Sequence, residues 1–204
     1  MAIAVHVGLY DTLADWELGY VTTHINNGEW HREPGRYQIV TVGTDREPIT
    51  TMGGMRITPD TALDEISPSN SAMLILPGAA NWMPDGNKEF AHKAAEFLAA
   101  GTPVAAICGA TAGLASAGLL DDRAHTSDAA EFLAMTGYAG AAHYRDEPAV
   151  ADRGLITATG ISPVAFAREI FALLEVYEPA VLAAWYKLYG LNDPAGYHEL
   201  MGAE

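Results

Sequence analysis

Short, fully apolar runs alternate along the chain with longer segments in which apolar residues recur every three or four positions. The first pattern is typical of strands buried on both faces, and the second of amphipathic helices. The apolar runs predict strands at residues 2–9, 37–43, 72–76 and 103–107, short strands around a glycine turn at 47–59, and a strand pair within 143–159. The helical spacing predicts helices at residues 12–28, 87–100, 109–117, 128–137, 162–177 and 179–189.

Capping residues indicate where several of these helices begin and end. Thr12 is the expected N-cap of the first helix, with Asp15 three residues further on, and Gly28 is its expected end. Asp128 and Glu131 have the spacing of a capping box for a later helix. The residues from 191 onward are polar and aromatic, and no element is assigned to them.

The alternation of apolar strands with helices predicts an α/β fold with a doubly wound, mostly parallel sheet covered by helices on both faces. No repeat, low-complexity tract or linker divides the sequence, so we expect one domain over residues 1–204. The aromatic C-terminal segment from about residue 178 is a candidate lid or subunit contact.

Composition narrows the class of protein. The chain has 204 residues, of which 50% are hydrophobic, and 11 basic against 26 acidic residues give a net charge of −15. Such a charge argues against nucleic acid or an anionic membrane as a partner. The single cysteine permits no intrachain disulfide, and no signal peptide or membrane-length apolar run is present. We therefore expect a soluble, cytoplasmic protein.

The most informative segment surrounds that cysteine. Cys108 follows the buried strand 103–107 directly and precedes a helix of small residues that begins with Gly109. A tight strand-to-helix turn exposes such a side chain at the carboxyl edge of the sheet, and the helix N-terminus favours a thiolate. The competing interpretation is that a lone cysteine is a small buried hydrophobe. The context makes the two about equally favoured.

Two further segments end at the same edge of the predicted sheet. The strand 72–76 is followed by Pro77 and Gly78, whose backbone amides are candidates for an oxyanion hole, and Glu17 follows the first strand. An ordinary turn and a helix-dipole carboxylate are the simpler interpretations of these two features. The seven histidines show no metal-ligand spacing, and no phosphate-binding glycine motif occurs, so neither metal nor cofactor is expected.

Together these segments resemble the ThiJ/PfpI superfamily, which includes the parkinsonism-associated deglycase and the PfpI proteases. The residues that carry the resemblance are Ala-Ala-Ile-Cys108-Gly109, Leu-Ile-Leu-Pro-Gly78, Glu17, the Gly-Leu-Leu at 118–120 and Leu-Ile-Thr-Ala-Thr-Gly160-Ile-Ser-Pro163. The resemblance implies a flavodoxin-like, class I glutamine amidotransferase-like fold and a homodimer. It also implies that Cys108 is a nucleophile, Glu17 its acid partner, and Gly78 and Gly109 the oxyanion donors.

The sequence departs from the family pattern where other members carry histidine. Gly109 stands directly after the cysteine, where protease-type members have histidine, and Asp128 stands where many hydrolytic members have one. An aspartate cannot replace the imidazole of a Cys–His pair, so we expect Asp128 to cap the next helix. His125 and His143 are the remaining candidates to reach the site, and Trp16 and Ala79 are candidate pocket residues.

Three functions fit these residues. The first is a cysteine-dependent enzyme for a small carbonyl compound, of glyoxalase, deglycase or hydrolase type, in which Glu17 moves the proton of Cys108. The second is a redox-responsive stress protein in which Cys108 is oxidised to the sulfinate without turnover. The third is a binding or scaffold subunit with a vestigial site.

Overall fold

The computed structural model describes residues 2–83 and 86–203, and its centre is a seven-stranded sheet. The strand order is β5-β2-β1-β6-β7-β9-β8, and every neighbouring pair is parallel except β8 with β9. The strands of this sheet are β1 (Ile3–Gly8), β2 (Tyr37–Gly43), β5 (Thr61–Ala62), β6 (Ser71–Leu76), β7 (Val104–Ile107), β8 (Ala149–Asp152) and β9 (Leu155–Ala158). The predicted α/β, mostly parallel, doubly wound sheet is confirmed.

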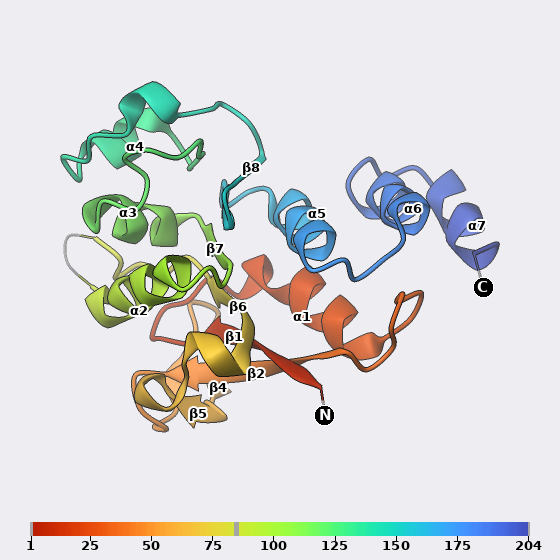
Figure 1. Ribbon diagram of the computed structural model, residues 1–204, viewed down its shortest axis with the longest axis horizontal. Coiled ribbons are helices and arrows are strands. Elements are labelled where there is room, and N and C mark those ends of the chain that lie inside the picture. Colours follow the sequence, from red (N-terminus) through yellow and green to blue (C-terminus); the bar gives the residue numbers. More distant parts are fainter. Residues whose placement is uncertain (1, 84–85, 204) are drawn as a thin grey trace.

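Helices cover both faces of the sheet (Figure 1). Two of them, α1 (Gly19–Asn27) and α5 (Pro163–Leu173), pack against one another on one face, while α2 (Lys88–Ala99) and α3 (Gly109–Ser116) cover the other. The remaining helices are α4 (Ala130–Ala134), which packs on α3, α6 (Pro179–Tyr189), which packs on α5, and α7 (Ala195–Met201), which packs on α6.

The central strands are mostly apolar because both of their faces are buried. Every residue of β7 is fully buried, and so are the last four residues of β6. Burial of these side chains supplies the hydrophobic free energy that holds the helices on the sheet. A separate hairpin of β3 (Ile49–Thr50) and β4 (Arg56–Ile57) confirms the predicted glycine turn.

The first helix begins later than its sequence indicates. Thr12 is not an N-cap: it has a φ of 64°, and its N–H donates to the Thr50 carbonyl. The segment around it lies between the hairpin and residues 78–80, and these pairings hold it out of a helix. A 3-10 turn, η1 (Asp15–Glu17), follows, and α1 starts only at Gly19 and ends, as predicted, at Gly28.

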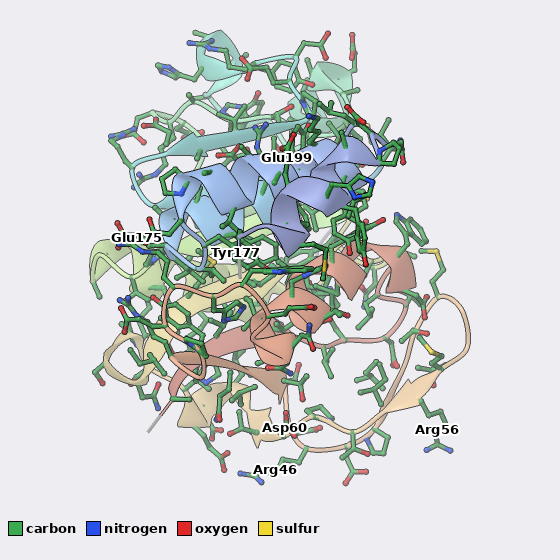
Figure 2. The ribbon with its side chains drawn as sticks, turned by 90° about the vertical axis from the view of Figure 1, so that its right-hand side faces the viewer. Arg46, Arg56, Asp60, Glu175, Tyr177 and Glu199 are labelled. Atoms are coloured by element: carbon green, nitrogen blue, oxygen red, sulfur yellow. The ribbon has the colours of Figure 1, made fainter. Side chains whose placement is uncertain are left out.

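Several other boundaries also differ. The predicted strand pair is present but starts at Ala149, because His143 ends a 3-10 turn, η4 (Ala141–His143). The helix α5 ends at Leu173 and not near residue 177. The segment from residue 191 onward, for which the sequence predicts no element, contains α7, and Leu200 of this helix is fully buried. Side chains of the C-terminal helices, including Glu199, stand in front of the sheet in Figure 2.

The topology brings four loops to one edge of the sheet. The chain moves outward from β1 to β2 and then returns to place β6 on the other side of β1. Open α/β sheets bind ligands at such a switch point, outside the carboxyl ends of the strands. Here the segments after β1, β6, β7 and β9 meet at that edge. None of the helices in the described residues is long and apolar enough to span a bilayer.

Candidate active site

Cys108 occupies a strained turn between β7 and α3. Its φ of 56° and ψ of −128° are rare for a residue with a side chain. The turn is fixed on both sides: the Cys108 N–H donates to the Ala158 carbonyl at 3.0 Å, and its own carbonyl accepts from the Thr111 hydroxyl at 2.6 Å. The surrounding structure therefore maintains a conformation that presents the sulfur at the sheet edge.

Glu17 reaches this sulfur because the 3-10 turn η1 directs Asp15 toward the hairpin and Glu17 into the interior. Asp15 is directed outward and accepts hydrogen bonds from the Thr51 hydroxyl at 2.5 Å and the Gly53 N–H at 2.7 Å. Glu17, two residues later, is fully buried. The hairpin thus anchors the turn through Asp15, and the anchoring places a carboxylic acid in the interior.

Gly78 and Gly160 lie so close to the Cys108 sulfur that a side chain at either position would clash with it. A Cβ on Gly78 would lie 2.9 Å from both Cys108 Sγ and Glu17 Oε1, and a Cβ on Gly160 would lie 2.8 Å from Sγ. The absence of side chains there lets Glu17 Oε1 and the sulfur approach one another. Glu17 Oε1 is also buried without any other hydrogen-bond partner among the described residues.

The peptide between Pro77 and Gly78 is held at both of its polar ends. The Gly78 N–H donates to Glu17 Oε2 at 2.6 Å, while the Pro77 carbonyl accepts from the Tyr10 hydroxyl and from Trp82 Nε1. The expectation that Gly78 supplies an oxyanion donor is therefore corrected, because its N–H is already engaged by Glu17.

The amides that remain for an oxyanion are those of Ala79 and Gly109. Leu13 and Ala79 form an antiparallel bridge whose hydrogen bond runs from the Ala14 N–H to the Gly78 carbonyl, which leaves the Ala79 N–H outside the pairing. The Gly109 N–H stabilises the charged sulfur and lies at the start of α3, where it has no partner within the helix. Both residues line the cavity described below.

Asp128 is the second carboxylate beside the Cys108 sulfur. Its Oδ1 accepts from the Gly160 N–H at 2.6 Å, and its carboxylate also interacts with the Cys108 thiol. The expectation that Asp128 caps the following helix is wrong, because α4 has no side-chain cap and Asp128 is turned toward Gly160 instead. The segment is anchored nearby by the 2.7 Å contact between the hydroxyls of Ser127 and Thr111.

Burial and the neighbouring charges shift both members of the Glu17–Cys108 pair. Burial raises the pKa of Glu17 to about 7, against the lowering effect of its hydrogen bond from Gly78. Burial, followed by the negative charges of Glu17 and Asp128, raises the pKa of the Cys108 thiol. The sequence indicates a thiol made acidic by its helix N-terminus, whereas burial, together with the two carboxylates, shifts its pKa in the opposite direction. Since the groups are in contact, they titrate as a pair.

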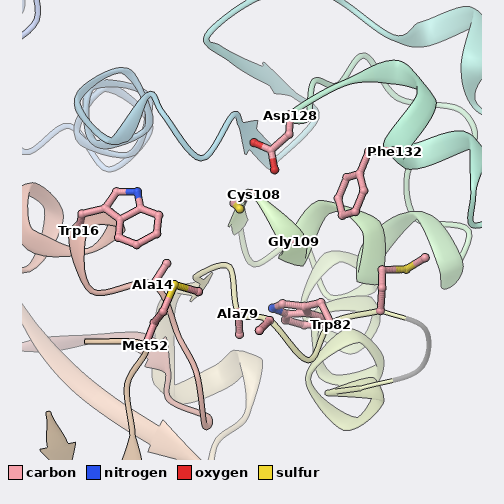
Figure 3. A pocket seen from close by; sticks show the side chains of 11 residues that line it. Ala14, Trp16, Met52, Ala79, Trp82, Cys108, Gly109, Asp128 and Phe132 are labelled. Carbon is pink, nitrogen blue, oxygen red and sulfur yellow. The ribbon is translucent and has the colours of Figure 1, made fainter. Parts of the chain in front are cut away.

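A cavity of about 260 Å³ opens onto the sulfur (Figure 3). Its walls are largely apolar and include Trp16, whose indole N–H donates to the Gly160 carbonyl at 2.9 Å. The Asp128 carboxylate points toward Cys108 across the cavity. The described residues that line it are Ala14, Trp16, Met52, Ala79, Ala80, Trp82, Met83, Cys108, Gly109, Asp128 and Phe132.

The two candidate histidines lie elsewhere. His125 is fully buried, with Nδ1 bonded to the Arg123 carbonyl and Nε2 to the Tyr138 hydroxyl, and burial lowers its pKa. His143 lies in η4 and, like His125, is not among the cavity residues. Over residues 2–83 and 86–203, no group of three or more His, Cys, Asp or Glu side chains gathers as a metal site.

Sequence reasoning missed several contributors to the site. The sequence patterns give no separate role to Gly160, Tyr10, Met52 or Phe132, although each touches the site or the loop that forms it. Tyr10 follows the first strand and Gly160 the last, so the rule that strand ends meet at one edge was the signal that could have found them.

Comparison with known proteins gives consistent matches over almost the entire chain. The model of the DJ-1/PfpI family matches residues 3–173. An uncharacterized protease of Bacillus subtilis, YoaZ, is 40% identical over 97% of this chain and 95% of its own. The crystal structure of a thiJ/pfpI family protein from Bacillus anthracis superposes with a TM-score of 0.91 at 37% identity, covering 100% of this chain and 97% of that one. The DJ-1 superfamily protein Atu0886 from Agrobacterium tumefaciens gives 0.82 at 32% identity, over 94% and 100%.

Proposed function

The chain belongs to the DJ-1/PfpI family, and we propose that it is a cysteine-dependent enzyme acting on small carbonyl compounds, with Cys108 as nucleophile and Glu17 as proton carrier. The observation that carries this proposal is the position of Glu17 Oε1, which is buried without another hydrogen-bond partner and directed at the space beside the sulfur. A carboxylic acid in that position takes the thiol proton as the sulfur attacks.

The proposed first step is addition of Cys108 to a carbonyl carbon. A C–S bond forms, the π electrons of the C=O bond move to oxygen, and the thiol proton passes to Glu17. The oxygen, which gains negative charge, is stabilised by the N–H groups of Ala79 and Gly109 and then takes the proton from Glu17. The product is a neutral hemithioacetal, or a tetrahedral intermediate for an acyl substrate.

The raised pKa of Glu17 suits this role. A general acid–base group is most effective when its pKa lies near the working pH, and burial raises the pKa of Glu17 to about 7. At neutral pH Glu17 is therefore present in both its protonated and its ionised form, and it can both accept and return a proton.

The size of the cavity supports a small molecule over a polypeptide as substrate. A volume of about 260 Å³ walled by Trp16, Trp82 and Phe132 lies below the roughly 300–1,000 Å³ of sites for drug-sized ligands and suits a small molecule. YoaZ is called a protease, but the described site of this chain offers no imidazole to protonate a peptide's leaving amine. We expect no cleavage of casein.

The experiment that tests the proposal compares the wild type with Glu17→Gln, Cys108→Ser and Glu131→Gln on a panel of small aldehydes and ketoaldehydes. Glu17→Gln keeps the size and the Gly78 contact but cannot accept the proton, and we expect kcat/KM to fall about 100-fold or more. Cys108→Ser should be inactive, whereas Glu131→Gln, an exposed change on α4, should match the wild type. Turnover by Glu17→Gln at the wild-type rate would refute the role of Glu17.

A further inference from the structure

Asp128 is the single carboxylate on the described wall of the cavity, and no described lining residue is lysine, arginine or histidine. The opening of the site is therefore acidic and has no compensating cation among these residues. A molecule that approaches Cys108 must therefore pass this negative charge.

The Asp128 carboxylate is held in position although the residue is exposed. Its Oδ1 accepts the 2.6 Å hydrogen bond from the Gly160 N–H. The preceding residues are tied down as well: Thr126 N–H donates to the Thr157 hydroxyl at 2.9 Å, and Ser127 contacts Thr111. A negative charge thus stands at a constant position across the cavity from Trp16 (Figure 3).

The Glu17–Cys108 pair contributes further negative charge to the site. Once the pair has lost its first proton it carries one negative charge, shared between the carboxyl and the sulfur. A bound anion would then face both this charge and that of Asp128. Arg46 is paired with Glu65, and Arg56 extends outward at the edge of the molecule in Figure 2, so neither offsets this charge at the cavity.

We infer that Asp128 is a specificity-determining residue that excludes anionic compounds from Cys108 and restricts the site to small uncharged electrophiles. The statement about substrates rests on the proposed function. The selectivity itself concerns which molecules reach the sulfur, and it can be measured without turnover. It predicts that carbonyl compounds bearing a carboxylate are poor substrates, and that uncharged compounds of equal size are good ones.

Iodoacetamide and iodoacetate are a matched pair of probes. They differ by one negative charge and have almost the same size. In both reactions the Cys108 sulfur displaces iodide: a C–S bond forms, the C–I bond breaks, and the thiol proton leaves through Glu17 to solvent. Because Cys108 is the single cysteine, intact mass reports the rate of each reaction without ambiguity.

The rate ratio of iodoacetamide to iodoacetate at pH 7.5 is measured and divided by the same ratio for glutathione. We expect this normalised ratio to be roughly ten or more for the wild type, given the strength of like-charge repulsion in a partly buried site. Asp128→Asn keeps an oxygen for the Gly160 N–H and removes the charge, so its ratio should fall to within about threefold of one. Glu131→Gln, which makes the same change of charge outside the cavity, should keep the wild-type ratio.

Two further measurements keep the inference testable if Asp128→Asn does not fold. The wild-type ratio should fall toward one in 0.5 M salt, because Asp128 is exposed and salt screens its repulsion of iodoacetate. Turnover of methylglyoxal should exceed that of glyoxylate in the wild type. A normalised wild-type ratio near one overturns the inference. An Asp128→Asn ratio equal to that of the wild type also overturns it, as does the failure of both reagents to modify Cys108 in the native protein. If the wild type shows the expected normalised ratio of alkylation rates but turns over no carbonyl compound, the proposed function alone is refuted.

Discussion

Glu17 Oε2 accepts a 2.6 Å hydrogen bond from the Gly78 N–H, and this contact joins the proton carrier to the loop beside the nucleophile. The same contact explains why the other carboxyl oxygen, Oε1, is free to face Cys108. One peptide group of the loop therefore orients the acid, and the neighbouring amide of Ala79 is left for the substrate.

The raised pKa of Glu17 predicts how stability depends on pH. The folded state keeps this proton up to about pH 7, whereas an unfolded glutamate loses it near 4.5. The folded state thus binds more protons in that interval, and its free energy of unfolding falls as the pH rises through it. The full shift is worth roughly 3 kcal/mol.

Urea unfolding at pH 5 and pH 8 checks this prediction. The loss of stability between these two pH values should be larger in the wild type than in Glu17→Gln, by up to roughly 3 kcal/mol. Staying at or below pH 8 keeps the unfolded cysteine mostly protonated. Equal pH dependence in the two proteins would mean that Glu17 does not hold its proton in the folded state.

The two glycines beside the sulfur predict a steric test. A Cβ on Gly78 would lie 2.7 Å from Cys108 Cβ, and a Cβ on Gly160 would lie 2.9 Å from the same atom. Substituting either by alanine should cost about 1–3 kcal/mol of stability through overpacking and should reduce carbonyl turnover more than tenfold. Gly19→Ala, where a Cβ would meet nothing within 4 Å, is the matched control. Full activity of Gly78→Ala would contradict the close Glu17–Cys108 contact.

The fold and part of the site could be predicted from the sequence because they depend on local patterns. The apolar run 103–107 and the small residues after it sufficed to place Cys108 at a strand-to-helix turn. Asp128 was different: its spacing to Glu131 fits a capping box, but its partner is the N–H of Gly160, 32 residues away. Likewise, Thr12 has the sequence of an N-cap, but pairing with Thr50 holds it out of the helix. Contacts between distant segments overrode local signals in both cases.

The redox alternative makes a different prediction for peroxide. Oxidation to the sulfinate places a permanent negative charge beside Asp128 and the Ala79 and Gly109 amides. The amides and a protonated Glu17 would stabilise the sulfinate, while Asp128 repels it, so we expect Cys108 to gain two oxygens several-fold more slowly in the wild type than in Asp128→Asn, as followed by intact mass. Rapid sulfinate formation in the wild type at low peroxide, equal to that of the variant, would favour a stress-responsive role over catalysis.

The most direct test of the shared proton is the rate of Cys108 alkylation by iodoacetamide as a function of pH. Glu17 can take the thiol proton only when it is ionised, which occurs near pH 7, so the wild-type rate should rise with a midpoint well below the value of about 8.5 for a free thiol. In Glu17→Gln the thiol has no acid partner, and burial together with Asp128 keeps its pKa raised, so the midpoint should move above 8.5. A wild-type midpoint at or above 8.5, or the same midpoint in both proteins, would contradict the account.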